Sequence, residues 1–287
     1  MPAYKRQHYL PAAYLKYFSN DGANCSRRSF VYRCDEQGQR VVRVDSQCAA
    51  KWHYSKRDPA GAEEMFQGAE QEYCRCVDKL CEGRELTGSD YGRLLVNMFD
   101  FYVRNAVHKN LTGKEGIDAY RIRCAFFWSK LLGKTGVITK EDIQNHVEKY
   151  WGLQILIAPG TRHFITCDHP SVWTSINDDQ PDLHLLTVPI TPRLMAVAFD
   201  RRILSVIEQG MTEEDYLTLN AGPMSNAVSC VYSAVPFSDE QIAQMKAHLA
   251  GKEDPGCFIE EGNWRFKIAG LRPEHYFSFM QLSPPLM

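Results

Sequence analysis

The chain has 287 residues, of which 33 are lysine or arginine and 35 are aspartate or glutamate, so its formal net charge is −2. Hydrophobic residues make up 44% and charged residues 24%, which excludes a collagen-like, mucin-like or disordered chain. The charge is divided unevenly, because residues 1–60 carry 11 basic and 5 acidic side chains and residues 61–287 carry 22 and 30. Such a basic front end is typical of contact with an anionic partner.

The first 60 residues predict a short helix and a β-hairpin. Pro11 is suited to the first turn of a helix over 11–18. Residues 29–34 and 40–44 alternate apolar and polar side chains around a turn at 35–38, which indicates two antiparallel strands. The arginines expected on the solvated face of this hairpin are Arg33, Arg40 and Arg43.

Four segments with apolar residues spaced near 3.6 residues predict a block of helices. They run over about 61–82, 89–110, 117–132 and 140–151. We expect Ser89 to cap the second helix and Thr139 to cap the fourth, with Asp142 completing a capping box. The loops between the later helices contain the glycines and lysines of 109–116 and 133–136.

The second half of the chain changes to short apolar runs separated by turn residues, which predicts strands. These lie at 153–158, 162–167, 185–190, 194–199, 227–232 and 264–268. Two helices interrupt them, one near 212–220 and one over 238–249 that opens with the capping box of Ser238 and Gln241.

Because most strands follow the helices, the order of elements favours an α+β fold. We expect a helical block packed on one face of an antiparallel or mixed β-sheet, with an N-terminal β-hairpin. The chain is expected to form a single domain over 1–287. A subdivision is conceivable between a hairpin and helices at 1–151 and a sheet-rich half at 152–287.

The sequence predicts no membrane contact and a cytoplasmic location. Its longest apolar stretches are far shorter than the roughly 20 residues of a membrane span. The N-terminal segment is not a charged and then apolar leader. In the cytoplasm the cysteines are expected to be reduced. Cys74, Cys76 and Cys81 lack the paired spacing of a zinc site, so no metal ligand is assigned. The oligomeric state is not predicted.

Two short motifs combine residues suited to chemistry. The first is Gln7-His8-Tyr9-Leu10-Pro11, and Leu15 and Phe18 follow it at helical spacing. The second is Thr166-Cys167-Asp168-His169-Pro170, in which an expected strand ends in an acid held close before proline. A strand end is a rigid place from which to present a carboxylate. Phosphate-binding glycine loops, nucleophile elbows and the H-E-x-x-H zinc motif are absent from the sequence.

On these two motifs the chain resembles the uncharacterised bacterial family called domain of unknown function 4238. Members open with H-Y-[VIL]-P-x-x-x-L-x-x-F and later carry a T-S-D-N-P-like segment. Weaker similarity continues through segments 52–54, 188–192 and 230–233 and the helices around Glu70 and Arg104. Cys167 and His169 stand where the family has Ser and Asn. The resemblance supplies candidate positions and implies no activity.

Four residues are the candidate catalytic groups, and each also has a structural explanation. His8 suits a general base or a phosphate ligand, or it caps buried backbone. Asp168 can orient a base or activate water, or it can cap a turn. Arg104 can clamp a substrate or form a salt bridge with Glu70 or Asp168. Glu70 lies in a charge-rich helix where most acids face water.

The candidate substrate-binding residues are Tyr9, His169, Asn220, Arg33 and Arg43. Asn220 can instead end its helix, since Gly222 and Pro223 follow.

Three functions compete at this point. The first is a hydrolase acting on a phosphodiester or nucleotide, a nuclease-like effector, in which a divalent cation such as Mg²⁺ or Mn²⁺ could assist. The second is a non-catalytic module that binds nucleic acid or senses a ligand. The third is a structural protein with a buried polar network. We place the hydrolase first because histidine, carboxylates and arginines accompany the basic front end.

Overall fold

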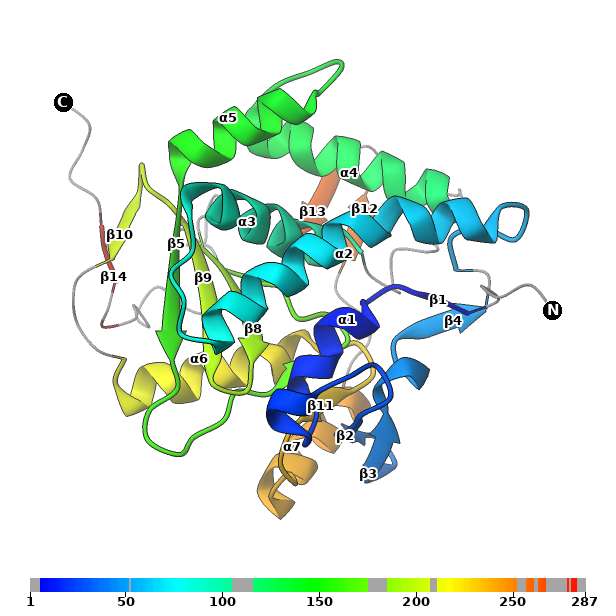
Figure 1. The fold of residues 1–287 in the computed structure, drawn as a ribbon, viewed down its shortest axis with the longest axis vertical. Helices are drawn as coiled ribbons and strands as arrows, with labels where there is room; N and C mark the ends of the chain where they lie inside the picture. The colour runs from blue at the N-terminus through cyan, green and yellow to red at the C-terminus, as the bar shows by residue number, and fades with distance from the viewer. Residues whose placement is uncertain are drawn as a thin grey trace.

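The computed structural model describes residues 6–51, 53–104, 116–174, 185–206, 211–251, 257–260, 263–266, 278 and 280–282. Parts of the predictions therefore lie outside the described residues: Trp52, the loop at 109–115 and positions 105–110 and 267–268. The helix predicted over 89–110 ends earlier, at Val103, because the backbone of Arg104 is extended. The described chain has the expected α+β architecture, with helices packed against antiparallel sheets (Figure 1).

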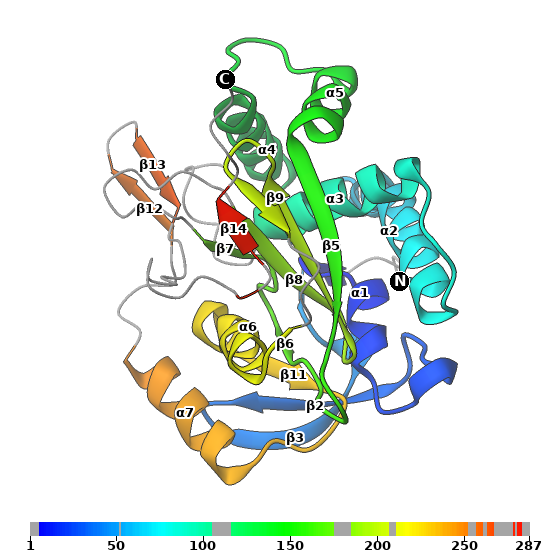
Figure 2. The same ribbon diagram turned by 90° about the vertical axis from the view of Figure 1, so that its left-hand side faces the viewer.

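The larger of two four-stranded sheets runs through the centre of the molecule (Figure 2). Its strands are all antiparallel and follow the spatial order β5-β9-β8-β7. Their bounds are β5 Trp151–Ile157, β7 Val172–Thr174, β8 Leu185–Thr191 and β9 Leu194–Asp200. Strand β8 is buried along its whole length, because elements cover both faces of the sheet.

Helices cover the two faces of this sheet. Leu186 and Val188 pack in the main core with residues of the predicted helical block. Leu185 and Val197 point the other way and pack with Tyr216 of α6. The bounds are α2 Pro59–Cys81, α3 Gly88–Val103, α4 Gly116–Leu132, α5 Lys140–Tyr150 and α6 Glu213–Asn226.

The second four-stranded sheet contains the predicted hairpin. Its order is β3-β2-β11-β6, and α7 packs against the hairpin strands (Figure 2). The bounds are β2 Phe30–Asp35, β3 Gly38–Arg43, β6 Thr166–Cys167, β11 Val231–Ser233 and α7 Asp239–Ala250. The predicted hairpin and the Ser238–Gln241 capping box are both present.

The described residues also form three two-stranded pairs, none of which was predicted as a pair, because their strands are too short to show a period. The pair that matters for the site joins β1, Arg6–His8, to β4, Ala49–Lys51. The short helix α1, Ala12–Leu15, follows and continues as a 3-10 turn over Lys16–Phe18. The other pairs join β10 Leu204–Val206 to β14 Met280–Leu282 and β12 Cys257–Glu260 to β13 Asn263–Phe266. Of these strands only β13 was predicted, at 264–268.

Three further predicted boundaries are wrong, each for a local reason. Helix α6 passes through Pro223 to Asn226, whose side-chain amide donates to the carbonyls of His169 and Ser171 and so anchors the last turn. The strand predicted at 227–232 begins only at Val231, since the N–H groups of Val228 and Ser229 donate to the carboxylate of Asp168. The strand predicted at 162–167 is reduced to Thr166–Cys167, since the N–H of Ile165 donates to the side chain of Asn220.

The main hydrophobic core takes residues from both halves of the chain. Tyr14 and Phe99 pack in one cluster with Val188 and Tyr232. The hydroxyl of Tyr14 lies 2.6 Å from both the Thr166 Oγ1 and the Pro189 carbonyl oxygen. This shared core is compatible with one domain over the whole chain, which stays a prediction. Among the described helices, none combines the length and apolar character needed to cross a bilayer.

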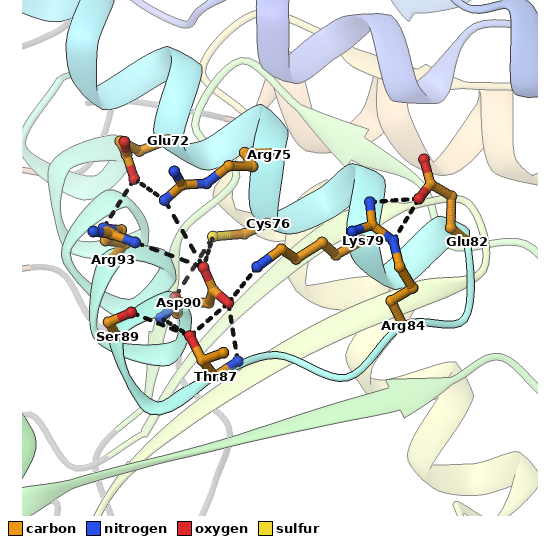
Figure 3. Close-up of polar contacts among 10 residues, drawn as sticks. All are labelled: Glu72, Arg75, Cys76, Lys79, Glu82, Arg84, Thr87, Ser89, Asp90 and Arg93. Carbon is orange, nitrogen blue, oxygen red and sulfur yellow. Dashed lines mark hydrogen bonds and ion pairs between the residues drawn. The ribbon is translucent and has the colours of Figure 1, made fainter.

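A buried carboxylate locks α2 to α3. Thr87, not Ser89, caps α3, and Asp90 closes the capping box by accepting from the Thr87 N–H and hydroxyl. Asp90 also accepts a 2.7 Å hydrogen bond from Lys79 of α2. Figure 3 shows Arg75 and Arg93 on the other side of the same carboxylate. The Lys79 ammonium and the capping bonds hold the pKa of Asp90 well below its ordinary value.

We predict that Asp90→Ala lowers the free energy of unfolding by about 2 kcal/mol, because the cap and the Lys79 partner are lost together. Urea denaturation measures the effect. Because the native pKa is depressed, the contribution of Asp90 is present at neutral pH and lost as the pH falls below about 4. Asp118→Ala, which removes an exposed partner of Arg121, is the control and should cost under about 1 kcal/mol. Equal losses in the two variants would contradict this role.

Candidate functional site

His8 is held in place through its backbone and its ring. Its strand pairs with β4 in register with Ala49, and its imidazole Nε2 lies 3.3 Å from the Asp45 carbonyl oxygen. Burial lowers the pKa of His8 below 6.5, although the Asp45 carbonyl and the nearby Glu70 carboxylate oppose this. His8 is therefore mostly neutral at pH 7. If Nε2 donates to Asp45, Nδ1 is the basic nitrogen.

Arg104 is the hub that joins His8 to Glu70. The side chain is 2% exposed and lies where α3 ends. Its guanidinium donates 3.2 Å hydrogen bonds to the Glu70 carboxylate and a 3.0 Å hydrogen bond to the His8 carbonyl oxygen. It thus links α3, α2 and β1 by directional, charge-assisted bonds. Arg104 donates to groups of the protein, as expected of a structural salt bridge.

Further partners of Arg104 were not singled out from the sequence. Asp100 lies one turn earlier on α3, 3.6 Å from the guanidinium, and Tyr54 accepts a 3.3 Å hydrogen bond from Nε. The guanidinium carbon lies 3.9 Å from the centroid of the Phe66 ring. Burial alone would lower the pKa of Arg104, but Tyr54, Asp100 and Glu70 outweigh it and raise that pKa.

Glu70 lies at one end of an open cleft along α2. The cleft has a volume of about 380 Å³. Its lining residues are Ala13, Arg27, Glu70, Gln71, Cys74, Arg75, Asp78, Glu82 and Arg84. The second carboxylate oxygen of Glu70 lies 3.8 Å from Arg27, whose side chain is 63% exposed. Glu70 therefore connects the buried hub to an accessible arginine.

Glu63 is a second acid near His8. It lies two helical turns before Glu70 on the same face of α2 and contacts the backbone N–H of His8. Burial and the neighbouring Glu70 raise the pKa of Glu63. The seven-residue spacing of Glu63 and Glu70 in the sequence already indicates that both acids share one face of a helix.

Tyr9, the residue after β1, has other neighbours than His8. Its backbone N–H donates to the Cys48 carbonyl oxygen at 3.0 Å, and its ring lies 5.4 Å from that of His53. Burial raises the pKa of Tyr9, and the nearby Cys48 and Asp168 raise it further. Cys48 and Cys230 share a partner there, since their sulfurs lie 3.3 and 3.2 Å from the Tyr232 hydroxyl.

Asp168 lies on the Tyr9 side and binds backbone. Its carboxylate oxygens accept 2.8 Å hydrogen bonds from the N–H groups of Val228 and Ser229, and the Ser229 hydroxyl donates at 2.6 Å. These bonds fix the turn that precedes β11. Asp168 is thus a neighbour of Tyr9, whose pKa it raises, and its carboxylate is held by residues 228 and 229.

His169 and Asn220 also bond to backbone. The His169 ring stacks on Tyr102 at 5.6 Å, and its two nitrogens lie 3.3 Å from the Tyr102 carbonyl oxygen and 3.2 Å from the Asn226 amide. The Asn220 side-chain oxygen accepts a 2.8 Å hydrogen bond from the Ile165 N–H. Asn220 lies in the middle of α6, which ends at Asn226, so the alternative that Asn220 ends its helix is wrong.

The two hairpin arginines differ from each other. Arg33 is not on a solvated face: it is 25% exposed, pairs with Asp35 at 3.0 Å and donates to Gln47 at 2.9 Å. Arg43 is 50% exposed and pairs with Asp45 at 2.5 Å. Since the carbonyl of Asp45 bonds to the His8 ring, Arg43 is the hairpin arginine connected to the candidate site.

Among the described residues, no group of three histidine, cysteine, aspartate or glutamate side chains is placed to hold a metal ion. Asp168, Glu70 and His8 do not converge as a ligand set. The use of Mg²⁺ or Mn²⁺ thus stays a proposal to be tested in solution.

The fold and site define an α+β protein in which a buried arginine hub holds a histidine and a glutamate beside a cleft. The profile of a family described as "Protein of unknown function (DUF4238)" matches residues 6–236. The chain belongs to this family. The match includes His8, Glu70, Arg104 and Asp168, and it confirms the family indicated by the two motifs. No curated protein and no solved structure was found to match the chain.

We predict that Arg104→Met lowers the free energy of unfolding by about 3–5 kcal/mol, because Glu70 and Asp100 lose a buried cationic partner. Chemical denaturation monitored by circular dichroism measures the loss. Arg121→Met is the matched control, since Arg121 is 67% exposed and pairs with an exposed aspartate. If Arg104→Met and Arg121→Met lower the free energy of unfolding by the same amount, the bonds of Arg104 do not hold the site together.

Proposed function

We propose that the protein is a hydrolase acting on a phosphodiester or nucleotide, with His8 and Glu70, which Arg104 connects, as its reacting groups. The observation that carries this proposal is that Arg104 bonds both to the His8 carbonyl oxygen and to the Glu70 carboxylate, and Glu70 lines an accessible cleft. Glu70 is also close enough to the half-buried imidazole of His8 to raise its pKa against the effect of burial. These groups are far apart in sequence, and Arg104 holds them together. A base near neutrality beside a cleft is the usual starting condition for acid–base chemistry.

The residues take different roles in this proposal. His8 removes a proton from the attacking water through Nδ1, and Glu70 favours the imidazolium that forms. Arg27 is exposed and loosely paired, so it is the cation suited to bind a phosphate oxygen as charge develops. Arg104 is a positioning residue, because its hydrogen bonds go to Glu70 and to the backbone of His8.

Asp168, His169 and Asn220 support the site from a distance in this proposal. Asp168 acts through the backbone of residues 228 and 229, next to Tyr9, and has no direct bond to His8 in this proposal. His169 and Asn220 fix α6 against the strands that carry this turn. The substrate-binding roles then fall to Arg27 and Arg43.

A second candidate is a non-catalytic module that binds a nucleotide or nucleic acid. It is favoured by the three arginines that line the cleft, Arg27, Arg75 and Arg84, because guanidinium groups suit phosphate. Salt-sensitive binding without product formation would select this candidate over the hydrolase.

The test is incubation of the purified protein with labelled RNA, DNA and nucleotides, with and without Mg²⁺ or Mn²⁺. We predict that His8→Ala reduces kcat on the accepted substrate by about 10²–10⁴-fold. His163→Ala, in the loop between β5 and β6, and Glu64→Gln, on the exposed face of α2, are controls and should keep activity. Absence of turnover on every substrate, or full activity of His8→Ala, would reject the hydrolase.

We also predict the direction of the pH dependence. Since His8 acts as a base and burial lowers its pKa, the rate should rise with pH through an apparent pKa below 6.5 and stay level around pH 7. Glu70→Gln removes the carboxylate that favours the charged imidazole, so this apparent pKa should fall further. Rates measured across pH 4.5–8 check both statements, at about half-unit intervals. A limb that falls with rising pH in this range would contradict the assignment of His8 as a base.

A further inference from the structure

The predicted hairpin carries an exposed patch that the proposed chemistry does not use. Phe30 of β2 is 46% exposed and Val41 of β3 is 52% exposed. In the register of the hairpin, Phe30 lies opposite Arg43 and Tyr32 lies opposite Val41. Directly opposed residues, and residues two apart on one strand, share a face. We call these four residues, Phe30, Tyr32, Val41 and Arg43, the hairpin patch. Tyr32 is half-buried beside α7, and the other three are exposed.

Exposed cations accompany the apolar side chains of the hairpin patch. The Arg43 side chain is 50% exposed at the patch itself, and Arg27, in the segment that leads into β2, is 63% exposed. Arg28 next to it is exposed as well. An exposed aromatic ring beside several arginines is complementary in charge and shape to a ligand with flat bases and phosphates.

A single residue connects the hairpin patch to the candidate site. The Asp45 carboxylate pairs with Arg43 at 2.5 Å, and the Asp45 carbonyl oxygen lies 3.3 Å from the His8 ring. The Asp45 N–H donates to the Arg27 carbonyl at 2.9 Å. The β1–β4 pair and the hairpin lie on the same side of the molecule (Figure 1). A chain bound at the hairpin patch would therefore extend toward His8.

We propose that the hairpin patch binds single-stranded nucleic acid, with a base on Phe30 and phosphates on Arg43 and Arg27. This inference rests on the proposed function, for which it names the substrate class. A duplex hides the faces of its bases in the stack, whereas a single strand exposes them to an aromatic ring. Every base has a face that can stack on an aromatic ring. The hairpin patch should therefore distinguish single strands from duplexes more strongly than it distinguishes one base from another.

The test is fluorescence anisotropy with labelled oligothymidine and oligouridine of about 12 nucleotides and a duplex of the same length. Phe30→Ala should weaken binding of the single strands by about fivefold or more. Ile122→Ala is the matched control, because Ile122 is 41% exposed on α4 and lies outside the hairpin patch.

The salt dependence of binding tests the arginine. Arg43→Gln should reduce the slope of log affinity against log salt by about 0.7, and Arg121→Gln should leave that slope unchanged.

Several outcomes would overturn the inference: no binding of any oligonucleotide, equal binding of duplex and single strand, or equal effects of Phe30→Ala and Ile122→Ala. The same measurements separate it from the hydrolase. Tight binding of single strands without turnover supports the hairpin patch and rejects the hydrolase. Turnover of a dinucleotide without binding of longer strands, at a rate that Phe30→Ala does not change, supports the hydrolase and rejects the hairpin patch.

Discussion

The candidate site depends on one buried cation. Arg104 is almost fully removed from water, and leaving such a charge unpaired would cost several kcal/mol. The chain meets this constraint with Glu70, Asp100, Tyr54 and the carbonyl of His8. Each partner comes from a different element or a different turn. Satisfying one guanidinium therefore fixes where α2, α3 and β1 lie relative to one another.

The two polar clusters, one around His8 and one around Tyr9, have different properties. On the His8 side are carboxylates and arginines, and Glu70 lines a cleft. On the Tyr9 side, burial raises the pKa of the Cys48 and Cys230 thiols, and Asp168 raises both further. Neutral thiols are poor nucleophiles and poor metal ligands. The contrast supports placing acid–base chemistry on the His8 side.

The sequence predicted the α+β fold, the hairpin, the helical block and the family, because these depend on periods and motifs that are local. It also offered Glu70 as a partner of Arg104. It could not choose between Glu70 and Asp168, because that choice depends on how α2 packs on α3. Helical spacing alone would have identified two further acids of the site. Asp100 lies four residues before Arg104, and Glu63 lies seven residues before Glu70. The β1–β4 pair could not be identified in this way, because three residues show no period.

The partners of Arg104 have a consequence for the order in which the protein is made. His8, Tyr54, Glu70 and Asp100 all precede Arg104 in the chain, and Tyr120, which donates to Asp100, follows soon after. The Tyr9 side needs Asp168 and Cys230, which a ribosome adds much later. Every described partner of Arg104 is thus synthesised before the first strand of the central sheet, which begins at Trp151. The groups that neutralise this buried charge are therefore all present when the two halves of the shared core come together.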